Sequence, residues 1–436
     1  MTLRSALSRV LLGALFTSAL SGCSASLDSL GKDDSLPTTL APVTGPTDYP
    51  NAFVTLAKKP NDEVVKKIDK AFRQLFVDGD QATQAIYFEQ ADEQAVIYDV
   101  LHTNVRTEGM GLGMLIAVEL DNKDVFDRLW RRAAKDPVKR MLVDSGPAKG
   151  YFRSYCGEGI KGEKGTACYD VYGMQMFALA LIFAHNRWGS SSAMPYAGDA
   201  RALLDALQNK ELENGGLMEV EDEDHVVESV GSAFDPTTRL VREEPTGAAA
   251  GYHRSALEMP AVYELWAQAT GNPFWSEAAD AARSHLVASA DATTGLWPLR
   301  SYFDGSPVPD APTPAFTGQA YRTQLNLAID ALWGTAEPDQ TVVADRVLGF
   351  FSSQGSGLDQ YGASFTLDGT PIDPKPEQAL ISVNGALAVA ASAGVDRSAF
   401  VNTVWAQAIP SGDTRYYDGL LYLMSLLVLS GQLRVY

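Results

Sequence analysis

The chain has 436 residues, of which 46% are apolar and 20% are charged, so it can bury a large core and is not expected to be disordered. Its formal net charge is -19 at pH 7. A chain of this acidity is a poor partner for nucleic acid, because phosphate binding depends on clustered Lys and Arg side chains. A neutral substrate suits it better.

The first 22 residues have the layout of a secretory signal. Arg4 and Arg9 precede an apolar stretch over residues 10–20, and the letters "LSGC", ending at Cys23, follow it. This ending resembles a bacterial lipobox, in which the cysteine becomes the lipid-modified first residue of the mature chain. The alternative is an ordinary signal peptide followed by an incidental cysteine. We expect a lipid anchor at Cys23 and a place in the cell envelope, on the periplasmic or extracellular side, at the outer membrane if the cell is Gram-negative.

Residues 23–50 read as a flexible linker behind this anchor. They are rich in Ser, Thr, Pro, Gly and Asp, and they have no apolar period. No later apolar run approaches the roughly 20 residues that a helix needs to span a bilayer. We therefore expect one folded domain over residues 51–436, held at the membrane by the lipid anchor alone.

Twelve segments of this domain repeat apolar residues at three- and four-residue steps, the period of one helix face. The first begins at residue 61, and the others are 108–120, 123–135, 170–187, 199–210, 254–269, 274–288, 320–333, 339–353, 377–392, 398–408 and 419–430.

The helical segments differ in how much of their surface is apolar. Residues 173–184 and 419–431 are apolar nearly all round, whereas residues 124–136 keep one polar face. A helix that is hydrophobic on every side must be covered on every side, so the alternation predicts an inner ring of helices wrapped by an outer ring. The fold expected is an all-α (α/α)6 barrel; an α-solenoid is the alternative, but no fixed repeat period is present. Residues 211–253 break the rhythm and should form a long loop or a small hairpin.

Two cysteines remain inside the domain, Cys156 and Cys168. Outside the cytoplasm such a pair is expected to form a disulfide; the alternative is two free buried thiols. No His flanks either cysteine at ligand spacing, and no two of the five histidines are spaced as metal ligands, so we expect neither a metal site nor a cofactor.

Several long motifs resemble glycoside hydrolase family 8 in the same order along the chain. They are "VRTEGMGLGMLIAVELDNKDVFDRLWRRAAK" (105–135), "KGYFRSYC" (149–156), "FALALIFAHNRWG" (177–189), "MPAVYELWAQATGNPFW" (259–275), "TTGLWPLRSYFDGSPV" (293–308), "AYRTQLNLAIDALW" (320–333) and "YYDGLLYLMSLL" (416–427). The likeness is greatest to the branch that acts on xylan-derived oligosaccharides. It implies an (α/α)6 barrel that cleaves β-1,4-linked oligo- or polysaccharides with inversion.

The resemblance assigns the general acid to Glu108. An inverting glycosidase needs one protonated carboxyl to deliver a proton to the leaving oxygen, and burial raises a carboxyl pKa toward the working pH. Gly109, Gly111 and Gly113 have no side chains, so we expect a sugar ring to approach the backbone beside the acid. The alternative is that Glu108 only caps the helix it begins, with help from Thr107.

The resemblance fails at the base. The family usually carries an aspartate just before an aromatic-Arg pair, and the aligned residue here is Gln319. An amide cannot accept a proton at neutral pH. A second aspartate of the family aligns with Tyr172, and a third active-site segment is replaced by "ALEMP" (256–260). We assign the base to Asp170, with Asp99 and Asp304 as the other carboxylates near matched motifs.

Two interpretations therefore remain open: a hydrolase whose base comes from elsewhere, which we favour, and a carbohydrate-binding relative that has lost turnover. Pyranose faces stack on apolar rings, so aromatic residues in matched motifs are candidates for contact with sugar, although each alone suits packing as well. Tyr416 is one of them. The residues expected to bind substrate are Trp130, Tyr172, Gln319, Tyr321, Arg322 and Tyr417. The protein is expected to be a monomer.

Overall fold

The computed structural model describes residues 39–156, 166–221, 227–309, 315–355 and 357–436. The compact unit that contains them runs from Thr38 to Tyr436. The signal segment, Cys23 and the linker up to residue 38 lie outside the described residues.

The compact unit begins earlier than the expected boundary at residue 51. Leu40 and Val43 are buried, and the Ala41 N–H donates to the carbonyl of Ala269 at 2.8 Å. The Val435 N–H donates to the Tyr49 hydroxyl at 3.0 Å, so this segment packs beside the C-terminal end of the chain. Its few apolar residues follow no helical or strand period, which is why the sequence pattern did not mark it as part of the domain.

Six helices form an inner ring. Contacts run from each helix to the next in the ring and from the last back to the first. They are α3 (Thr107–Glu119), α5 (Val171–Trp188), α7 (Pro260–Thr270), α9 (Arg322–Leu332), α11 (Gln378–Leu387) and α13 (Arg415–Ser430). Every residue of α3 is buried, as is the run from Val171 to Ala184 of α5.

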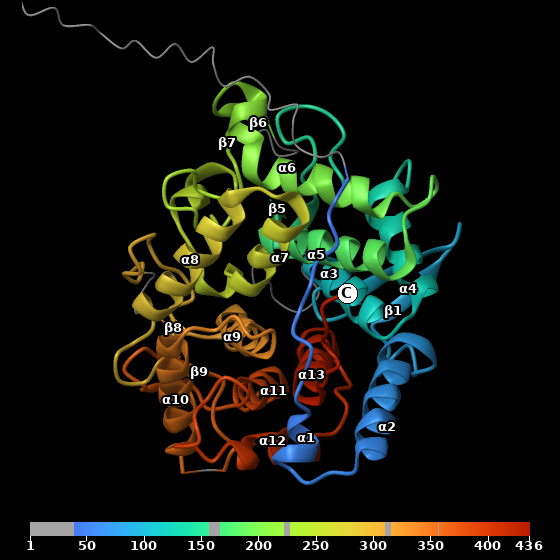
Figure 1. Ribbon diagram of the computed structural model, residues 1–436. Helices are drawn as coiled ribbons and strands as arrows, with labels where there is room; N and C mark the ends of the chain where they lie inside the picture. Colours follow the sequence, from blue (N-terminus) through green and yellow to red (C-terminus); the bar gives the residue numbers. More distant parts are fainter. Residues whose placement is uncertain (1–38, 157–165, 222–226, 310–314, 356) are drawn as a thin grey trace, which may run out of the picture. The chain divides into compact units, whose positions relative to one another are not determined.

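Six further helices cover the ring from outside. They are α2 (Asn61–Phe72), α4 (Lys123–Trp130), α6 (Tyr196–Asn214), α8 (Pro273–Ala288), α10 (Pro338–Ser352) and α12 (Arg397–Ala406). Each buries only one face; α2, for example, buries Val64, Ile68, Ala71 and Phe72. In Figure 1, α9, α11 and α13 lie between α10 on one side and α2 on the other. The predicted (α/α)6 barrel is confirmed, and its twelve helices match the twelve periodic segments.

Some helix boundaries differ from the sequence pattern. The helix expected from residue 254 begins at Pro260, after the short 3-10 turn η5 (Ser255–Leu257). Proline has no N–H to donate and its ring crowds the preceding turn, so it fits the first turn of a helix and not the interior. The residues in front of α7 are thereby left in a connection. One-turn helix α1 (Ala52–Thr55) and the π turns η2 (Arg73–Val77) and η3 (Arg131–Lys135) add to the pattern.

Short strands occupy the connections between helices. One antiparallel sheet has the order β1 (Tyr87–Gln90), β2 (Gln94–Asp99), β3 (Asn104–Val105), and another has the order β10 (Pro371–Asp373), β9 (Ser364–Thr366), β8 (Ala315–Phe316). Two hairpins pair β4 (Arg153–Cys156) with β5 (Thr166–Tyr169) and β6 (Met218–Glu221) with β7 (Val227–Val230). The second hairpin lies within the interval 211–253, where a loop or hairpin was expected. Two 3-10 turns, η4 (Gly247–Gly251) and η6 (Gly318–Tyr321), complete the elements.

A disulfide joins Cys156 and Cys168 across the first hairpin, with a Cα–Cα distance of 5.8 Å. The two residues are 12 positions apart. By loop-closure arithmetic such a bond contributes about 3 kcal/mol to stability. Because β5 leads directly into α5, the disulfide also ties the start of this inner helix to β4.

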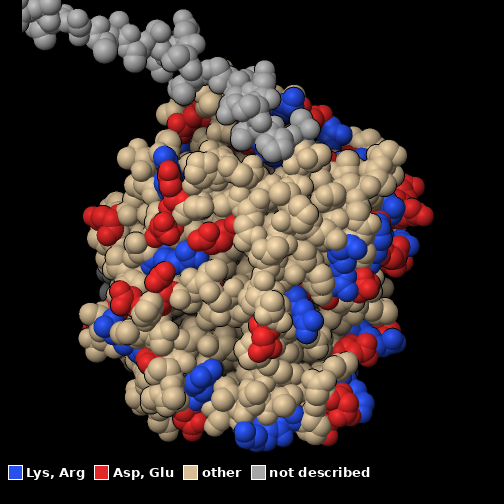
Figure 2. Space-filling view, in the orientation of Figure 1, with Lys and Arg blue, Asp and Glu red and all other residues tan. Residues whose placement is uncertain are grey.

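Within the described ranges, no helix is long and apolar enough to cross a membrane. In the same part of the chain, no group of three or more His, Cys, Asp and Glu side chains could hold a metal ion. On the face drawn in Figure 2, most Lys and Arg side chains have Asp or Glu side chains close by, and charges gather mainly toward the edge.

Candidate active site

Helix α3 places Glu108 at one end of the inner ring. Arg106 is the N-cap residue, and Glu108 is the second residue of the helix. A carboxylate in the first turn is favoured by the positive end of the helix dipole. The side chain is not on the surface, however, because Glu108 is only 7% exposed. The helix end therefore positions a buried acid, and a capping role on the protein surface does not describe it.

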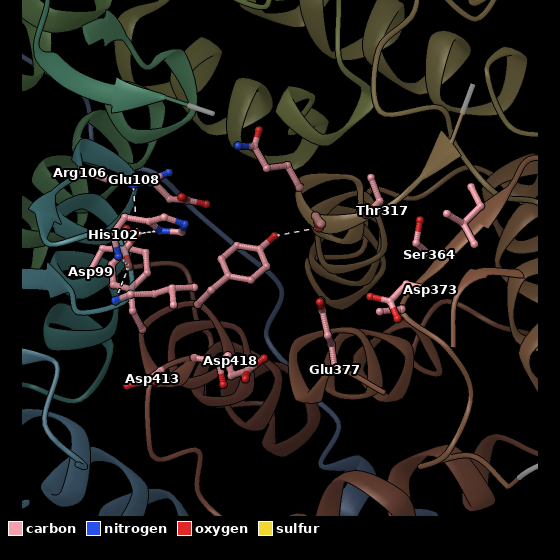
Figure 3. A pocket seen from close by; sticks show the side chains of 18 residues that line it. Asp99, His102, Arg106, Glu108, Thr317, Ser364, Asp373, Glu377, Asp413 and Asp418 are labelled. Atoms are coloured by element: carbon pink, nitrogen blue, oxygen red, sulfur yellow. Dashed lines mark hydrogen bonds and ion pairs between the residues drawn. The ribbon is translucent and has the colours of Figure 1, made fainter. Parts of the chain in front are cut away.

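Glu108 opens into a cavity of about 440 Å³. One wall comes from the β2–α3 region, the opposite wall from η6, β9, β10 and the start of α11, and the third side from the start of α13. The lining residues are Asp99, Leu101, His102, Arg106, Glu108, Thr317, Gly318, Gln319, Ala363, Ser364, Ile372, Asp373, Glu377, Asp413, Thr414, Tyr416, Tyr417 and Asp418. A volume of this size is in the range of pockets that take small ligands. Figure 3 shows Glu108 and Glu377 on opposite sides of it.

Arg322, from α9, is the cationic partner of Glu108. Its Nη1 donates to Glu108 Oε1 at 2.5 Å, and its guanidinium lies 4.1 Å from the ring centre of Tyr172. Tyr172 is itself buried, so its ring holds the guanidinium against the acid. Burial raises the pKa of Glu108, Arg322 opposes that effect, and the charge of Asp170 adds to it. Desolvation is the largest of these causes, so Glu108 holds its proton to a higher pH than an ordinary glutamic acid.

Gln319, at the position aligned with the missing base, is held by two arginines. Arg254 Nη1 donates to Gln319 Oε1, and Arg322 Nη2 approaches the same oxygen at 3.4 Å. Arg254 is in turn fixed by Glu243, to which its Nε donates at 2.7 Å. Guanidinium groups have donors and no acceptors, so the carbonyl oxygen of the amide must face them. The amide is part of the cleft wall and is engaged with two fixed cations.

The side formed by α13 supplies two tyrosines. Tyr417 is partly exposed to the cleft, and its hydroxyl donates to the carbonyl of Gly318 at 3.1 Å, so it links α13 to η6. Tyr416 is buried and packs beside Gly109. Tyr417 is therefore the better placed of the two for contact with a sugar face.

Other residues expected at the site lie outside the cavity lining. Trp130 is 2% exposed, packs on Phe152 and Phe177, and donates its indole N–H to Asp199 at 2.8 Å. It belongs to the apolar stripe of α4, which faces the inner ring, so we do not propose it as a sugar contact. Tyr321 is buried, and its hydroxyl donates to the carbonyl of Ala363.

Asp170, the residue assigned as the base from the sequence, caps α5 on the same side of the cleft as Glu108. Its Oδ1 accepts the Tyr172 N–H at 3.1 Å, and its Oδ2 accepts the Thr107 hydroxyl at 2.9 Å. An inverting base has to act on the sugar face opposite the acid, so this placement disfavours Asp170 for that role. Asp304 is also poorly placed: it accepts the Ser306 N–H at 2.9 Å in an exposed turn and does not line the cavity.

The glycines after Glu108 do not open the backbone to a sugar. A Cβ at Gly111 would lie 2.6 Å from Met176 Cβ, and one at Gly113 would lie 2.7 Å from a side-chain carbon of Ile97. A Cβ at Gly109 would lie 2.5 Å from the Tyr416 ring. The expectation of an approach by sugar is corrected: these glycines allow α3 to pack closely against its neighbours inside the protein.

A second group at the cavity surrounds Asp99, one of the carboxylates named from the sequence, but its partners His102 and Arg106 were not predicted. His102 Nδ1 lies 2.7 Å from Asp99 Oδ2, and Arg106 Nε lies 3.1 Å from the same oxygen. Asp99 also accepts the N–H groups of Leu101 and His102. The turn from β2 to β3 brings these residues together, and their spacing in the sequence matches no familiar motif.

The segment "ALEMP" (256–260), which replaces an active-site segment of the family, lies outside the cavity lining. Its Glu258 is completely buried and does not line the cavity.

The ion pair with Arg322 predicts a change in pH dependence. The general-acid role that the resemblance assigns to Glu108 requires its protonated form, so we expect activity to be lost as the pH rises through its pKa. Arg322→Gln removes the cation that lowers this pKa, and the alkaline limb of kcat/KM should therefore move to higher pH. Arg322→Lys, which keeps the charge, should move it less. An alkaline limb that stays in place or moves to lower pH in Arg322→Gln contradicts this account.

Two rings of helices around a cleft with a buried carboxylic acid are features expected of a glycoside hydrolase of the (α/α)6 type. The family model described as "Glycosyl hydrolases family 8" matches residues 91–239. The chain belongs to this family, since a relative is 32% identical over 89% of this chain and 97% of its own length. That relative is the reducing-end xylose-releasing exo-oligoxylanase Rex8A of Paenibacillus barcinonensis.

Further comparisons agree with this assignment. The reducing end xylose-releasing exo-oligoxylanase of Halalkalibacterium halodurans is 32% identical over 86% of this chain and 91% of its own length. Endoglucanase C of Ruminiclostridium cellulolyticum is 25% identical over 74% of this chain and 63% of its own length. The structure of a family 8 xylobiose complex from Teredinibacter turnerae is similar with a TM-score of 0.79 and 31% identity, covering 89% of this chain and 98% of that one.

Proposed function

We propose that this chain hydrolyses β-1,4-linked xylo-oligosaccharides with inversion, and that Glu108 protonates the leaving oxygen. The observation that carries the proposal is a buried carboxyl with a raised pKa at the wall of an open cavity of about 440 Å³. In this reaction the C1–O bond to the leaving sugar breaks as its oxygen takes the Glu108 proton, and water attacks C1 from the other face. Arg322 Nη1 donates to Glu108 Oε1 at 2.5 Å and so holds the carboxyl group in place.

The choice of xylo-oligosaccharides is supported by the names of the relatives. The two exo-oligoxylanases share 32% identity with this chain, and the endoglucanase shares 25%. Another similar structure, a catalytic mutant xylanase from Teredinibacter turnerae, holds xylohexaose. Glucan oligosaccharides are therefore the next substrates to consider, after xylan-derived ones.

The test uses the chain from residue 23 onward and a series of xylo-, cello- and chito-oligosaccharides. Products are separated by chromatography, and the anomer formed first is identified by proton NMR. We expect cleavage of xylo-oligosaccharides, with the α-anomer appearing before mutarotation. First appearance of the β-anomer would contradict inversion, and cleavage of cello-oligosaccharides alone would move the substrate assignment to glucans.

A second candidate function is binding of oligosaccharides without turnover, and the amide at Gln319 favours it. In such a protein Arg254 and Arg322 would still hold Gln319 in the wall of the cleft. Calorimetric titration with the same oligosaccharides separates the two functions. Saturable binding with no product after long incubation would favour a binding protein.

We also propose that the protein acts as a monomer in the cell envelope, anchored through lipid on Cys23. The proposal is supported by the apolar stretch and the "LSGC" letters that precede the domain. A monomer suffices because both walls of the cavity come from one chain. Fractionation of cells that produce the protein or its Cys23→Ser variant tests the anchor, and gel filtration of the soluble domain tests the oligomeric state.

A further inference from the structure

Inverting hydrolysis needs a second carboxylate, and the residue aligned with it cannot serve. Gln319 is an amide, and its oxygen already accepts from Arg254 and Arg322. A base has to remove a proton from the attacking water on the face of the sugar opposite the acid, with the two carboxyl groups roughly 6.5 to 9.5 Å apart in known enzymes. The base of this chain must therefore come from another wall of the same cleft.

Two of the carboxylates that line the cavity are fixed in other roles. Asp99 lies on the wall of the acid and is bound by His102 and Arg106. Asp418 is buried and caps α11, because its Oδ1 accepts the Ala379 N–H at 2.9 Å. Asp413, in the turn before α13, also lines the cavity and lies on the side of Asp99 in Figure 3.

Glu377 is placed differently. It is the N-cap residue of α11, yet its side chain makes no capping hydrogen bond, and Asp418 meets that need of the helix. Its side chain is exposed and points into the cavity from the side opposite Glu108 (Figure 3). Pro374 and Pro376 precede it, and proline fixes the backbone angle φ, so the carboxyl is presented from a stiff segment.

The neighbours of Glu377 connect it with the element where relatives carry the base. Burial raises the pKa of Tyr321, in η6 two residues after Gln319, and the charge of Glu377 adds to the rise. The Tyr321 hydroxyl donates to the carbonyl of Ala363. Tyr417 lies between the two walls: burial raises its pKa, and the charges of Glu108 and Glu377 both add to the rise. The carboxyl groups of Glu108, which is held by Arg322, and of Glu377 thus both act on Tyr417.

We propose that Glu377 is the general base of this enzyme. The assignment rests on the proposed hydrolytic function. One O–H bond of water breaks as its proton passes to a Glu377 oxygen, and the water oxygen bonds to C1 of the sugar. At the same time the C1–O bond breaks and the leaving oxygen takes the proton of Glu108. Glu377 ends protonated and Glu108 ends charged, and proton exchange with solvent restores both.

The experiment compares Glu377→Gln and Glu377→Ala with two controls, Asp304→Asn and Asp339→Asn. Both controls remove an exposed carboxylate that does not line the cavity. We expect kcat on xylo-oligosaccharides to fall on the order of 10³-fold in both Glu377 variants, with KM changed little, and each control to keep most of its activity. Glu377 is exposed, so the variants should unfold at the same temperature as the parent protein.

A chemical rescue separates a base from a residue that only shapes the cleft. Azide is a small anion that fits the space left by the carboxyl group in Glu377→Ala and can attack C1 directly. With an aryl β-xylobioside as substrate, azide should restore turnover of this variant and give the α-glycosyl azide, identified by NMR. It should not do so for Glu108→Ala.

The outcomes are distinguishable. Glu377 variants that keep the activity of the parent, or an equal loss in either Asp control, overturn the assignment of the base and leave the proposed hydrolysis intact if Glu108→Gln is inactive. Rescue that yields no glycosyl azide also overturns it. A parent protein that cleaves none of the substrates overturns both proposals.

Discussion

Glu108→Gln should lower kcat on xylo-oligosaccharides on the order of 10³-fold, the size of effect that general acids contribute. A sugar oxygen without a proton is a poor leaving group, and glutamine cannot supply one. The substitution keeps an oxygen within reach of Arg322 Nη1, which donates to Glu108 Oε1 at 2.5 Å in the parent protein, so KM should change little. With a 4-nitrophenyl leaving group, which departs without protonation, the loss should be much smaller.

Glu119→Gln is the matched control for this variant. Glu119 ends the same helix and is also buried, and burial raises its pKa as well. Its Oε2 accepts the Arg434 N–H at 3.0 Å, at the opposite end of α3 from Glu108. It does not line the cavity. Initial rates with both substrates decide the matter: a Glu108→Gln enzyme that stays active, or an equal loss in Glu119→Gln, contradicts the role of Glu108.

The helices could be predicted from the sequence because their packing imposes a period. An inner helix such as α5 is buried along Val171–Ala184, and an outer helix such as α2 buries one face, so both kinds leave a regular pattern of apolar residues. Because fully buried and half-buried helices alternate along the chain, an inner ring and an outer ring of helices could be predicted. The strands leave no such pattern. With β3 and β8 only two residues long, no period can develop in them.

The site was predictable where a long motif carried it and not elsewhere. Glu108 and Arg322 stand in extended matched segments, and the structure brings them into contact. Trp130 stands in such a segment too, but its indole fills the core, because the stripe that makes α4 amphipathic is the same one that contains the tryptophan. Glu377 follows two prolines in an exposed connection, where no periodicity marks a side chain as facing a cleft.

The role of the glycines that follow Glu108 could not be predicted from the sequence either. A run of glycines beside an acid can mean access for a ligand or close approach between helices, and the sequence does not distinguish the two. The neighbours of Gly111 and Gly173 decide it, since a Cβ on Gly111 would lie 2.9 Å from the Gly173 carbonyl oxygen. Helices α3 and α5 therefore approach each other through glycine on both sides, at the helix ends that hold the acid.

Gly173→Ala should consequently damage both stability and activity. A Cβ at this position would lie 2.3 Å from the carbonyl carbon of Thr107 and 2.5 Å from the Glu108 nitrogen. These are backbone atoms, so the clash is relieved only if α3 moves away from α5. Overpacking of this kind costs about 1 to 3 kcal/mol of unfolding free energy, in spite of the better helix propensity of alanine.

The activity should fall more than the loss of stability alone would require. A shift of α3 carries Glu108 with it, and a misplacement of about 1 Å can cost on the order of 10²-fold in rate. Gly349→Ala is the control: Gly349 lies inside α10, and a Cβ at this position would point into open space, so alanine should add up to about 1 kcal/mol of stability and leave kcat unchanged. Urea unfolding and initial rates at a temperature where both variants are folded measure the two effects. If Gly173→Ala is as stable and as active as Gly349→Ala, then the close contact of α3 with α5 does not position the acid.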